Sequence, residues 1–139
     1  MNTESSQVIR FAVDMETALH AFYVGASQRS RFRRIQEMFL SMADQKATNK
    51  EQLGTIAAAG MEPDFDLEDF ALFRNVELTP GMSYREIRNS SIQLEENAFI
   101  FYQNLSEFAQ EDDAKAVFLS LAQGAKQHLK IFQDQAFGK

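Results

Sequence analysis

The chain has 139 residues, with 20 acidic and 14 basic side chains, a net charge of −6 and no cysteine. This length corresponds to one domain, and the lack of cysteine excludes disulfides, thiol catalysis, zinc ribbons and iron–sulfur or rubredoxin-type centres. The acidic balance disfavours nucleic acid as a partner, because nucleic-acid binding usually needs a basic surface. No apolar run approaches the ~20 residues of a membrane span, so we expect no membrane partner and a cytoplasmic location.

Apolar residues recur at three- and four-residue steps in four segments, which is the pattern of helices that bury one face. The first stripe runs from Val8 to about Ala26, with a break expected at Gly25 and the polar residues after it. The second stripe continues through Ile56, and its helix is expected to end near Gly60.

Residues 60–82 show no sustained period and contain both prolines of the chain. A short helix is expected over Asp66 to Phe73, and Thr79-Pro80-Gly81 is typical of a turn. A connection of this length is unusual within a compact domain, so we expect it to cross over other elements.

Ser83 and Glu86 have the spacing of a capping box, which predicts the start of a third helix. The acidic run 111–113 ends that helix and precedes a fourth, expected from about Ala114 to Ala136. Four long helices with short, long and short connections predict an all-α, antiparallel four-helix bundle with one crossover.

The bundle is predicted to be one domain, 1–139, made of two helical hairpins at about 5–59 and 83–137 that flank the crossover 60–82. One offset of 79 residues relates the two hairpins, which indicates a duplicated hairpin. The matching positions are Phe22-Tyr23 with Phe101-Tyr102, Glu16 with Glu95, Ser27 with Ser106, and 39–43 with 118–122.

Glu16 and Glu95 are the informative members of this repeat. Each lies on the apolar stripe of its helix, six residues before the Phe-Tyr pair. A carboxylate on such a stripe is costly to bury unless it is paired or bound to a metal. One carboxylate from each hairpin is therefore expected in the middle of the bundle.

At these residues the sequence resembles the ferritin-like superfamily, and within it the rubrerythrin-type di-iron carboxylate proteins. Their pattern is a Glu before Phe-Tyr in the first helix and a Leu-Ala stretch leading into Glu-x-x-His in the second, followed by the same again. The matching segments here are 12–23 and 92–102, with the Leu-Ala portions of the second and fourth helices. The resemblance covers about residues 8–136 apart from the connector, and it implies a ferritin-like fold.

In that family each Glu-x-x-His supplies a bridging carboxylate and an imidazole from one helix face. Carried onto this chain, the second helix has Lys46 and Asn49 at these positions, and the fourth has Ala125 and His128. Both bridging carboxylates are therefore missing, and a normal pair of metal ions is not expected. The ligands that remain are Glu16, Glu95 and His128.

We expect the Lys46 ammonium to pair with both Glu16 and Glu95 and to stand where the family has a metal. The two negative charges of Glu16 and Glu95 would be balanced by Lys46 and a protonated His128. Pairing of these groups is expected to be obligatory, because an unpaired buried ion costs several kcal/mol. This hypothesis predicts that the chain holds no cofactor.

The competing interpretation is a single iron, manganese or zinc ion held by Glu16, Glu95 and His128. His20, one turn after Glu16, is a further candidate ligand, and otherwise an ordinary hydrogen-bonding core histidine. Lys46 argues against a metal, because its charge repels a cation and its side chain fills the space.

Tyr23 and Tyr102 are interpreted as packed aromatic residues around the site whose hydroxyls find a Glu partner. The resemblance offers a redox role as the alternative.

A separate feature is the cluster of arginines at 29, 31, 33 and 34, which is expected to be solvated or to bind an acidic partner.

Two main functions follow. The first is a ferritin-like bundle that has lost di-iron oxidase or peroxidase chemistry and has a structural, binding or regulatory role. The second is a rubrerythrin-like oxidoreductase or iron-binding protein with a remodelled di-iron or mono-metal site. The resemblance then implies a separate electron donor, since the chain lacks rubredoxin cysteines. No residue specifically supports a third function, the carriage of an apolar ligand. A homodimer is expected by analogy with other ferritin-like hairpins.

Overall fold

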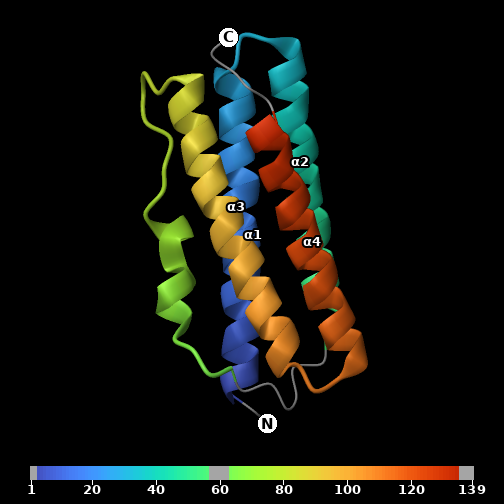
Figure 1. Cartoon of the computed structure of the whole chain (residues 1–139). Coiled ribbons are helices and arrows are strands. Elements are labelled where there is room, and N and C mark those ends of the chain that lie inside the picture. Colours follow the sequence, from blue (N-terminus) through green and yellow to red (C-terminus); the bar gives the residue numbers. More distant parts are fainter. Residues whose placement is uncertain (1–2, 57–62, 135–139) are drawn as a thin grey trace.

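The computed structural model describes residues 3–56 and 63–134 of the chain. Within these ranges the backbone forms four long α-helices and one short 3-10 helix, with no strand (Figure 1). The helices in chain order are α1 (Thr3–Arg29), α2 (Arg33–Leu53), η1 (Leu67–Arg74), α3 (Tyr84–Phe108) and α4 (Asp112–Asp134).

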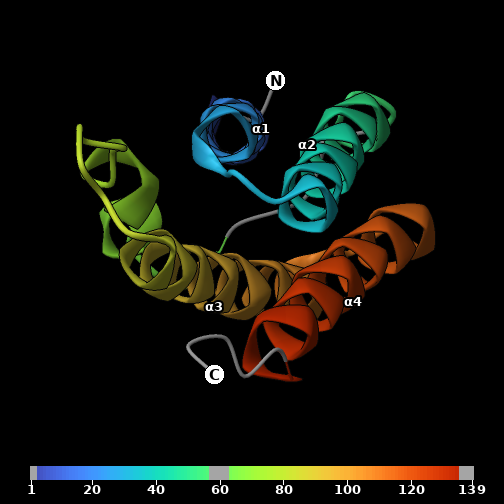
Figure 2. The same cartoon turned by 90° about the horizontal axis from the view of Figure 1, so that it is seen from above.

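The long helices form two antiparallel hairpins, α1 with α2 and α3 with α4, and the backbones approach most closely within each hairpin (Figure 2). The crossover returns along the bundle before α3 begins, so α2 and α3 run in the same direction (Figure 1). η1 lies against α1 and α3 on the outside of the bundle. The predicted all-α bundle with one long crossover is confirmed.

α1 continues through Gly25 and ends at Arg29, so the predicted break falls in the polar residues that follow the glycine and not at the glycine itself. A Cβ atom on Gly25 would lie 2.6 Å from Cδ1 of Leu78 in the crossover. The glycine therefore allows the crossover to pack directly on the helix backbone, and the helix ends four residues later at Arg29.

α2 ends at Leu53, so the predicted continuation of the helix through Ile56 is wrong. The amides of Thr55 and Ile56 bond back only three residues, and the Thr55 hydroxyl also donates to the Gln52 carbonyl at 2.7 Å. These tighter turns end the α-helix. The predicted stop at residue 60 lies outside the described residues.

The crossover contains the two features that its sequence predicts. The Asp66 carboxylate caps η1 by accepting a hydrogen bond from the Glu68 amide at 3.0 Å. The Met82 amide donates to the Thr79 carbonyl across a turn in which Gly81 has φ +82°, a conformation that favours glycine.

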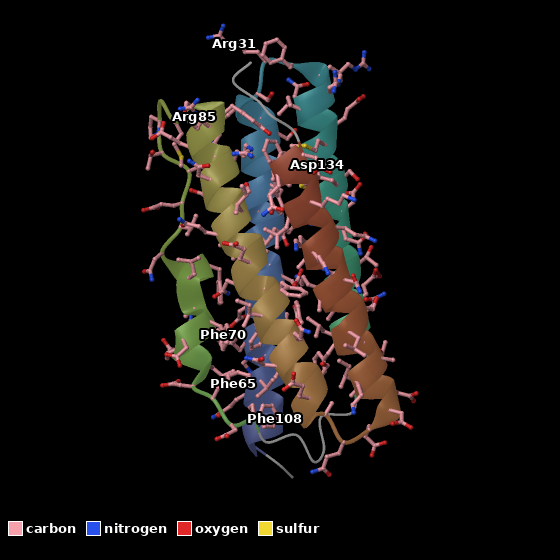
Figure 3. The ribbon with its side chains drawn as sticks, in the orientation of Figure 1. Arg31, Phe65, Phe70, Arg85, Phe108 and Asp134 are labelled. Carbon is pink, nitrogen blue, oxygen red and sulfur yellow. The ribbon has the colours of Figure 1, made fainter. Side chains whose placement is uncertain are left out.

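Aromatic packing holds the crossover on the bundle. Phe65 and Phe70 lie beside the lower part of α3, near Phe108 (Figure 3). The ring centroid of Phe65 lies 5.2 Å from that of Phe70 and 6.0 Å from that of Phe108. Phe70 also approaches Phe101, in the bundle core, to 5.5 Å. Such pairs add to the free energy gained by burying the rings.

α3 begins as predicted. The Ser83 hydroxyl accepts from the Glu86 amide at 3.1 Å, and the Glu86 carboxylate accepts from the Ser83 amide at 2.9 Å, which completes the capping box. α4 begins at Asp112, two residues before its predicted start, and its predicted end at Ala136 lies outside the described residues. Within the described ranges, no helix combines the length and apolarity needed to cross a membrane.

Candidate functional site

The interior between the two hairpins holds a cluster of buried polar side chains, to which all four long helices contribute. Glu16 and Glu95 are both 0% exposed and Lys46 is 1% exposed. Helical spacing explains the convergence, since residues three, four or seven apart share one face of a helix. The cluster comprises Glu16 and Tyr23 of α1, Lys46 and Asn49 of α2, Glu95 and Tyr102 of α3, and His128 of α4.

Glu95 accepts hydrogen bonds from three other helices. The Lys46 ammonium donates to its Oε1 at 3.0 Å. The Tyr23 hydroxyl donates to its Oε2 at 2.5 Å, and Nδ1 of His128 lies 3.1 Å from the same oxygen. Both carboxylate oxygens therefore face hydrogen-bond donors.

Glu16 has a separate set of partners. The Tyr102 hydroxyl donates to its Oε2 at 2.5 Å, and the Asn49 amide nitrogen donates to its Oε1 at 3.0 Å. The Asn49 amide oxygen in turn accepts from Gln45 at 3.0 Å, which orients the amide with its NH₂ group toward Glu16.

The network follows the sequence repeat in one part and departs from it in another. Tyr23 donates to Glu95, and Tyr102, 79 residues after Tyr23, donates to Glu16. These two hydrogen bonds cross between the hairpins as a reciprocal pair. Lys46 breaks the symmetry because its counterpart in the repeat is Ala125, which is buried and has no polar group.

Electrostatics favour an ion pair at the centre of the cluster. Burial alone would raise the pKa of Glu95, but Lys46 and the donors His128 and Tyr23 outweigh it and lower that pKa to about 2. Burial alone would lower the pKa of Lys46, but Glu95 and Glu16 outweigh it and raise that pKa. At neutral pH the structure thus holds a charged lysine against a charged carboxylate.

The two tyrosines remain neutral donors in this environment. Burial raises the pKa of the Tyr23 hydroxyl well above its ordinary value, and the negative charge of Glu95 raises it further. Burial and the charge of Glu16 have the same effect on the pKa of Tyr102. Each hydroxyl therefore keeps the proton that it donates to a carboxylate.

His20 lies at the edge of this region and is half-buried. Its Nδ1 donates to the Ala43 carbonyl of α2 at 2.9 Å, so this ring nitrogen joins the helices of the first hairpin and does not contact Glu16 or Glu95. Across residues 3–56 and 63–134, no three His, Asp or Glu side chains are grouped so that they could hold a metal ion.

Two participants, Gln45 and Ser91, and one contact of Asn49 were not predicted from the sequence. The hydrogen bond from Asn49 to Glu16 was missed, as was the support that Gln45 gives Asn49. Ser91, one turn before Glu95, is fully buried, and its hydroxyl donates to the Ile87 carbonyl at 2.8 Å. A polar residue on an apolar stripe, one turn from a buried Glu, is the signal that could have identified Ser91.

Comparisons with known proteins agree with this architecture. A solved structure of a hypothetical protein from Pyrococcus furiosus superimposes with a TM-score of 0.72 over 96% of this chain and 88% of its own, at 18% sequence identity. This likeness supports the helical-bundle fold. No curated protein sequence matches the chain. The sequence profile of the Rubrerythrin family matches residues 7–136, and the chain therefore belongs to the Rubrerythrin family.

Proposed function

We propose that this protein is a rubrerythrin-family bundle that has lost the di-iron centre together with its oxidase or peroxidase chemistry. It uses the closed bundle in a structural, binding or regulatory role. The observation that carries the proposal is the ion pair between Lys46 and Glu95, with 3.0 Å between ammonium and carboxylate oxygen. A cation of the protein itself occupies the interior between the hairpins.

The donor set at the site supports this proposal. Two neighbouring metal ions need bridging ligands, and the two positions where the resemblance implies bridging carboxylates carry Lys46 and Ala125. An ammonium group repels a metal cation, and an alanine cannot coordinate one. The residues present therefore do not fit a pair of metal ions.

The remaining carboxylates are also satisfied without a metal. Glu95 accepts from Lys46, Tyr23 and His128, and Glu16 accepts from Tyr102 and Asn49. A metal at either carboxylate would have to displace one of these donors and leave its polar group unpaired in the interior, at a cost in free energy. We therefore assign the cluster to stabilising the contact between the hairpins.

The test restores the missing ligands. The triple variant Lys46→Glu, Asn49→His, Ala125→Glu has the full set of ligands that the resemblance implies. We expect it to take up about two iron ions per chain, whereas the natural protein under the same loading takes up none in stoichiometric amount. Metal analysis after removal of loosely bound iron gives the result.

A matched control moves the same side chains to the neighbouring positions on the outer faces of α2 and α4. The control variant is Ala47→Glu, Lys50→His, Lys126→Glu, and it should not gain iron. If the triple variant is folded by circular dichroism but takes up no iron, the assigned ligand register is wrong. If the natural protein itself takes up stoichiometric iron, the proposal is wrong and the remodelled Glu/His site is favoured.

A further inference from the structure

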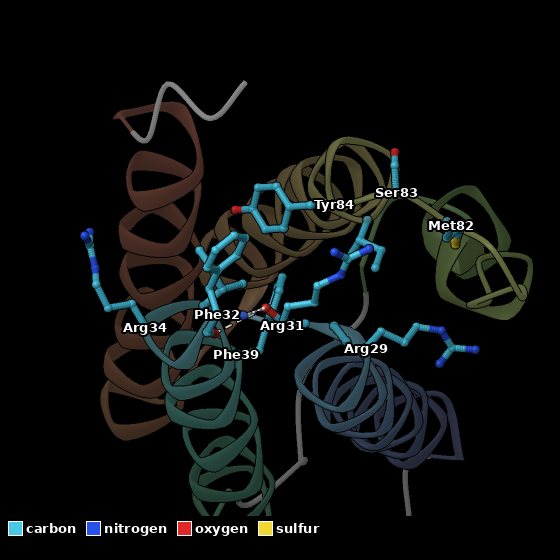
Figure 4. Close-up of a pocket in the computed structure, with 12 residues that line it drawn as sticks. Arg29, Arg31, Phe32, Arg34, Phe39, Met82, Ser83 and Tyr84 are labelled. Carbon is cyan, nitrogen blue, oxygen red and sulfur yellow. Dashed lines mark hydrogen bonds between the residues drawn. The ribbon is translucent and has the colours of Figure 1, made fainter. Parts of the chain in front are cut away.

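A pocket of about 610 Å³ opens at the end of the bundle where α1 ends and α2 and α3 begin (Figure 4). It lies at the turn between α1 and α2. Its volume is within the range of pockets that bind small molecules, about 300–1,000 Å³.

Three exposed arginines lie around this pocket. Arg31 lies at the end of the bundle (Figure 3), and Arg29 and Arg34 lie at the rim of the pocket with their side chains pointing outward on opposite sides (Figure 4). No acidic residue lines the pocket. Within the described ranges, none of the three guanidinium groups forms an ion pair.

The neighbouring Arg33 provides a contrast. It does not line the pocket, and its guanidinium lies 3.4 Å from the Glu37 carboxylate one turn along α2. Among the described residues, three positive charges without an ion-pair partner thus line one pocket in a chain whose net charge is −6. Guanidinium groups form paired hydrogen bonds with carboxylate and phosphate oxygens.

The inner wall of the pocket is apolar. Ile35, Phe39 and Ile87, all buried core residues, form its floor, and Met82 lines one side. Phe32 stands at the mouth with 71% of its surface exposed, the largest value among the exposed large hydrophobic residues in the described ranges. A charged rim above an apolar floor matches a ligand with a charged head and an apolar body.

We propose that this pocket binds a small organic anion, in which a carboxylate or phosphate head contacts Arg31 and an aliphatic or aromatic body lies on Phe32 and Ile35. The proposal is independent of the fate of the metal site, because the two sites share no charged residue. It gives a function to the arginine cluster that the buried network leaves unused.

Calorimetric titration of the full chain with octanoate and with octyl phosphate tests the proposal. We expect saturable one-to-one binding of at least one of them, with a dissociation constant below about 1 mM. The anion that binds more tightly shows whether the pocket prefers a carboxylate or a phosphate head group. Octylammonium should not bind and acetate should bind far more weakly, because the first lacks the negative head and the second lacks the apolar body.

Variants locate the binding. The change Arg31→Gln should weaken it by about tenfold, and Phe32→Ala should weaken it several-fold. Arg33→Gln is the matched control, since it removes an equal charge from a nearby position that does not line the pocket, and it should leave the affinity unchanged. All these positions are exposed, so thermal unfolding should stay close to that of the natural protein.

Three results would overturn the proposal. The first is the absence of saturable binding for both anions. The second is an equal loss of affinity in Arg33→Gln and in Arg31→Gln, which would show general attraction to positive charge. The third is binding of octylammonium as tight as that of octanoate.

Discussion

Lys46 is the side chain on which the interior of this protein depends. It is 1% exposed and lies against Glu95, whose carboxylate is itself fully buried. A buried ion pair is not by itself strongly stabilising, because both ions lose their hydration. Removing one partner is nevertheless costly, because the other is left charged and unpaired in the interior. This asymmetry leads to a test on a single residue.

Lys46→Met keeps the length of the side chain but removes its charge. We expect the free energy of unfolding to fall by about 3–5 kcal/mol, because Glu95 loses its cation. Urea unfolding measures the change. Lys50→Met, one turn later and partly exposed, should change stability by less than ~1 kcal/mol.

The double variant Lys46→Met, Glu95→Gln separates a lost ion pair from lost packing. It should recover part of the stability, because neither charge remains buried. A double variant less stable than Lys46→Met would contradict the ion-pair account. It also provides a folded species to examine if Lys46→Met does not fold.

The lowered pKa of Glu95 makes stability depend on pH. The ordinary pKa of a glutamate is 4.5, and the pKa of Glu95 in the folded protein is about 2. The contribution of Glu95 to the free energy of unfolding is therefore complete above pH 4.5 and is lost as the pH falls toward 2. The shift corresponds to about 3 kcal/mol. The difference in stability between the natural protein and Glu95→Gln should shrink across this interval, as followed by urea unfolding at each pH. A difference that stays constant from pH 5 to 2 would show that Glu95 has no lowered pKa.

At the level of the elements, α3 shows how a local signal fixes a helix. Its first turn is held by the reciprocal hydrogen bonds of Ser83 and Glu86, and no distant residue is needed to recognise them. The same capping box marks the point where the crossover ends. This element could therefore be predicted from four residues of sequence.

Ser83→Ala removes the side-chain cap of α3. We expect a loss of about 1 kcal/mol in the free energy of unfolding, because the Glu86 amide loses its acceptor. Urea or thermal unfolding gives the value. Ser120→Ala, on the exposed face of α4, is the control and should be neutral or slightly stabilising, since alanine favours helices. Equal losses in the two variants would argue against a capping role.

Other elements depend on residues far away in the sequence. Gly25 has the local signal of a helix break, yet it lies inside α1, where the lack of a Cβ leaves room for Leu78 of the crossover. The end of α2 at Leu53 depends on hydrogen bonds around Thr55 that compete with a continuing apolar stripe. Periodicity predicts which face of a helix is buried. It does not predict these helix boundaries, because they depend on contacts and hydrogen bonds that the apolar pattern does not encode.

The buried site was predictable in its membership and less so in its connections. Glu16 and Glu95 stand out as acids on apolar stripes, and Lys46 stands out through the repeat. The sequence hypothesis paired Lys46 with both carboxylates, whereas in the structure it donates to Glu95, and Asn49 donates to Glu16. Which donor faces which acceptor depends on how the two hairpins are set against each other, and no single helix specifies that.

For the molecule as a whole, two hairpins meet across a polar layer of tyrosines, carboxylates and one lysine. The reciprocal hydrogen bonds of Tyr23 and Tyr102 tie the hairpins together through groups from both. In this arrangement each buried carboxylate accepts hydrogen bonds from side chains of other helices. The arginine-lined pocket lies at one end of the bundle, where a ligand can bind without entering this layer.

The central claim is that a lysine ammonium stands where the resemblance implies a metal. Anomalous X-ray scattering at the iron, manganese and zinc edges, from crystals of protein purified without chelators, tests it most directly. We predict no anomalous peak among Glu16, Glu95 and His128, with the Lys46 nitrogen within hydrogen-bond distance of Glu95. An anomalous peak bound to these carboxylates, with Lys46 turned away, would contradict the account.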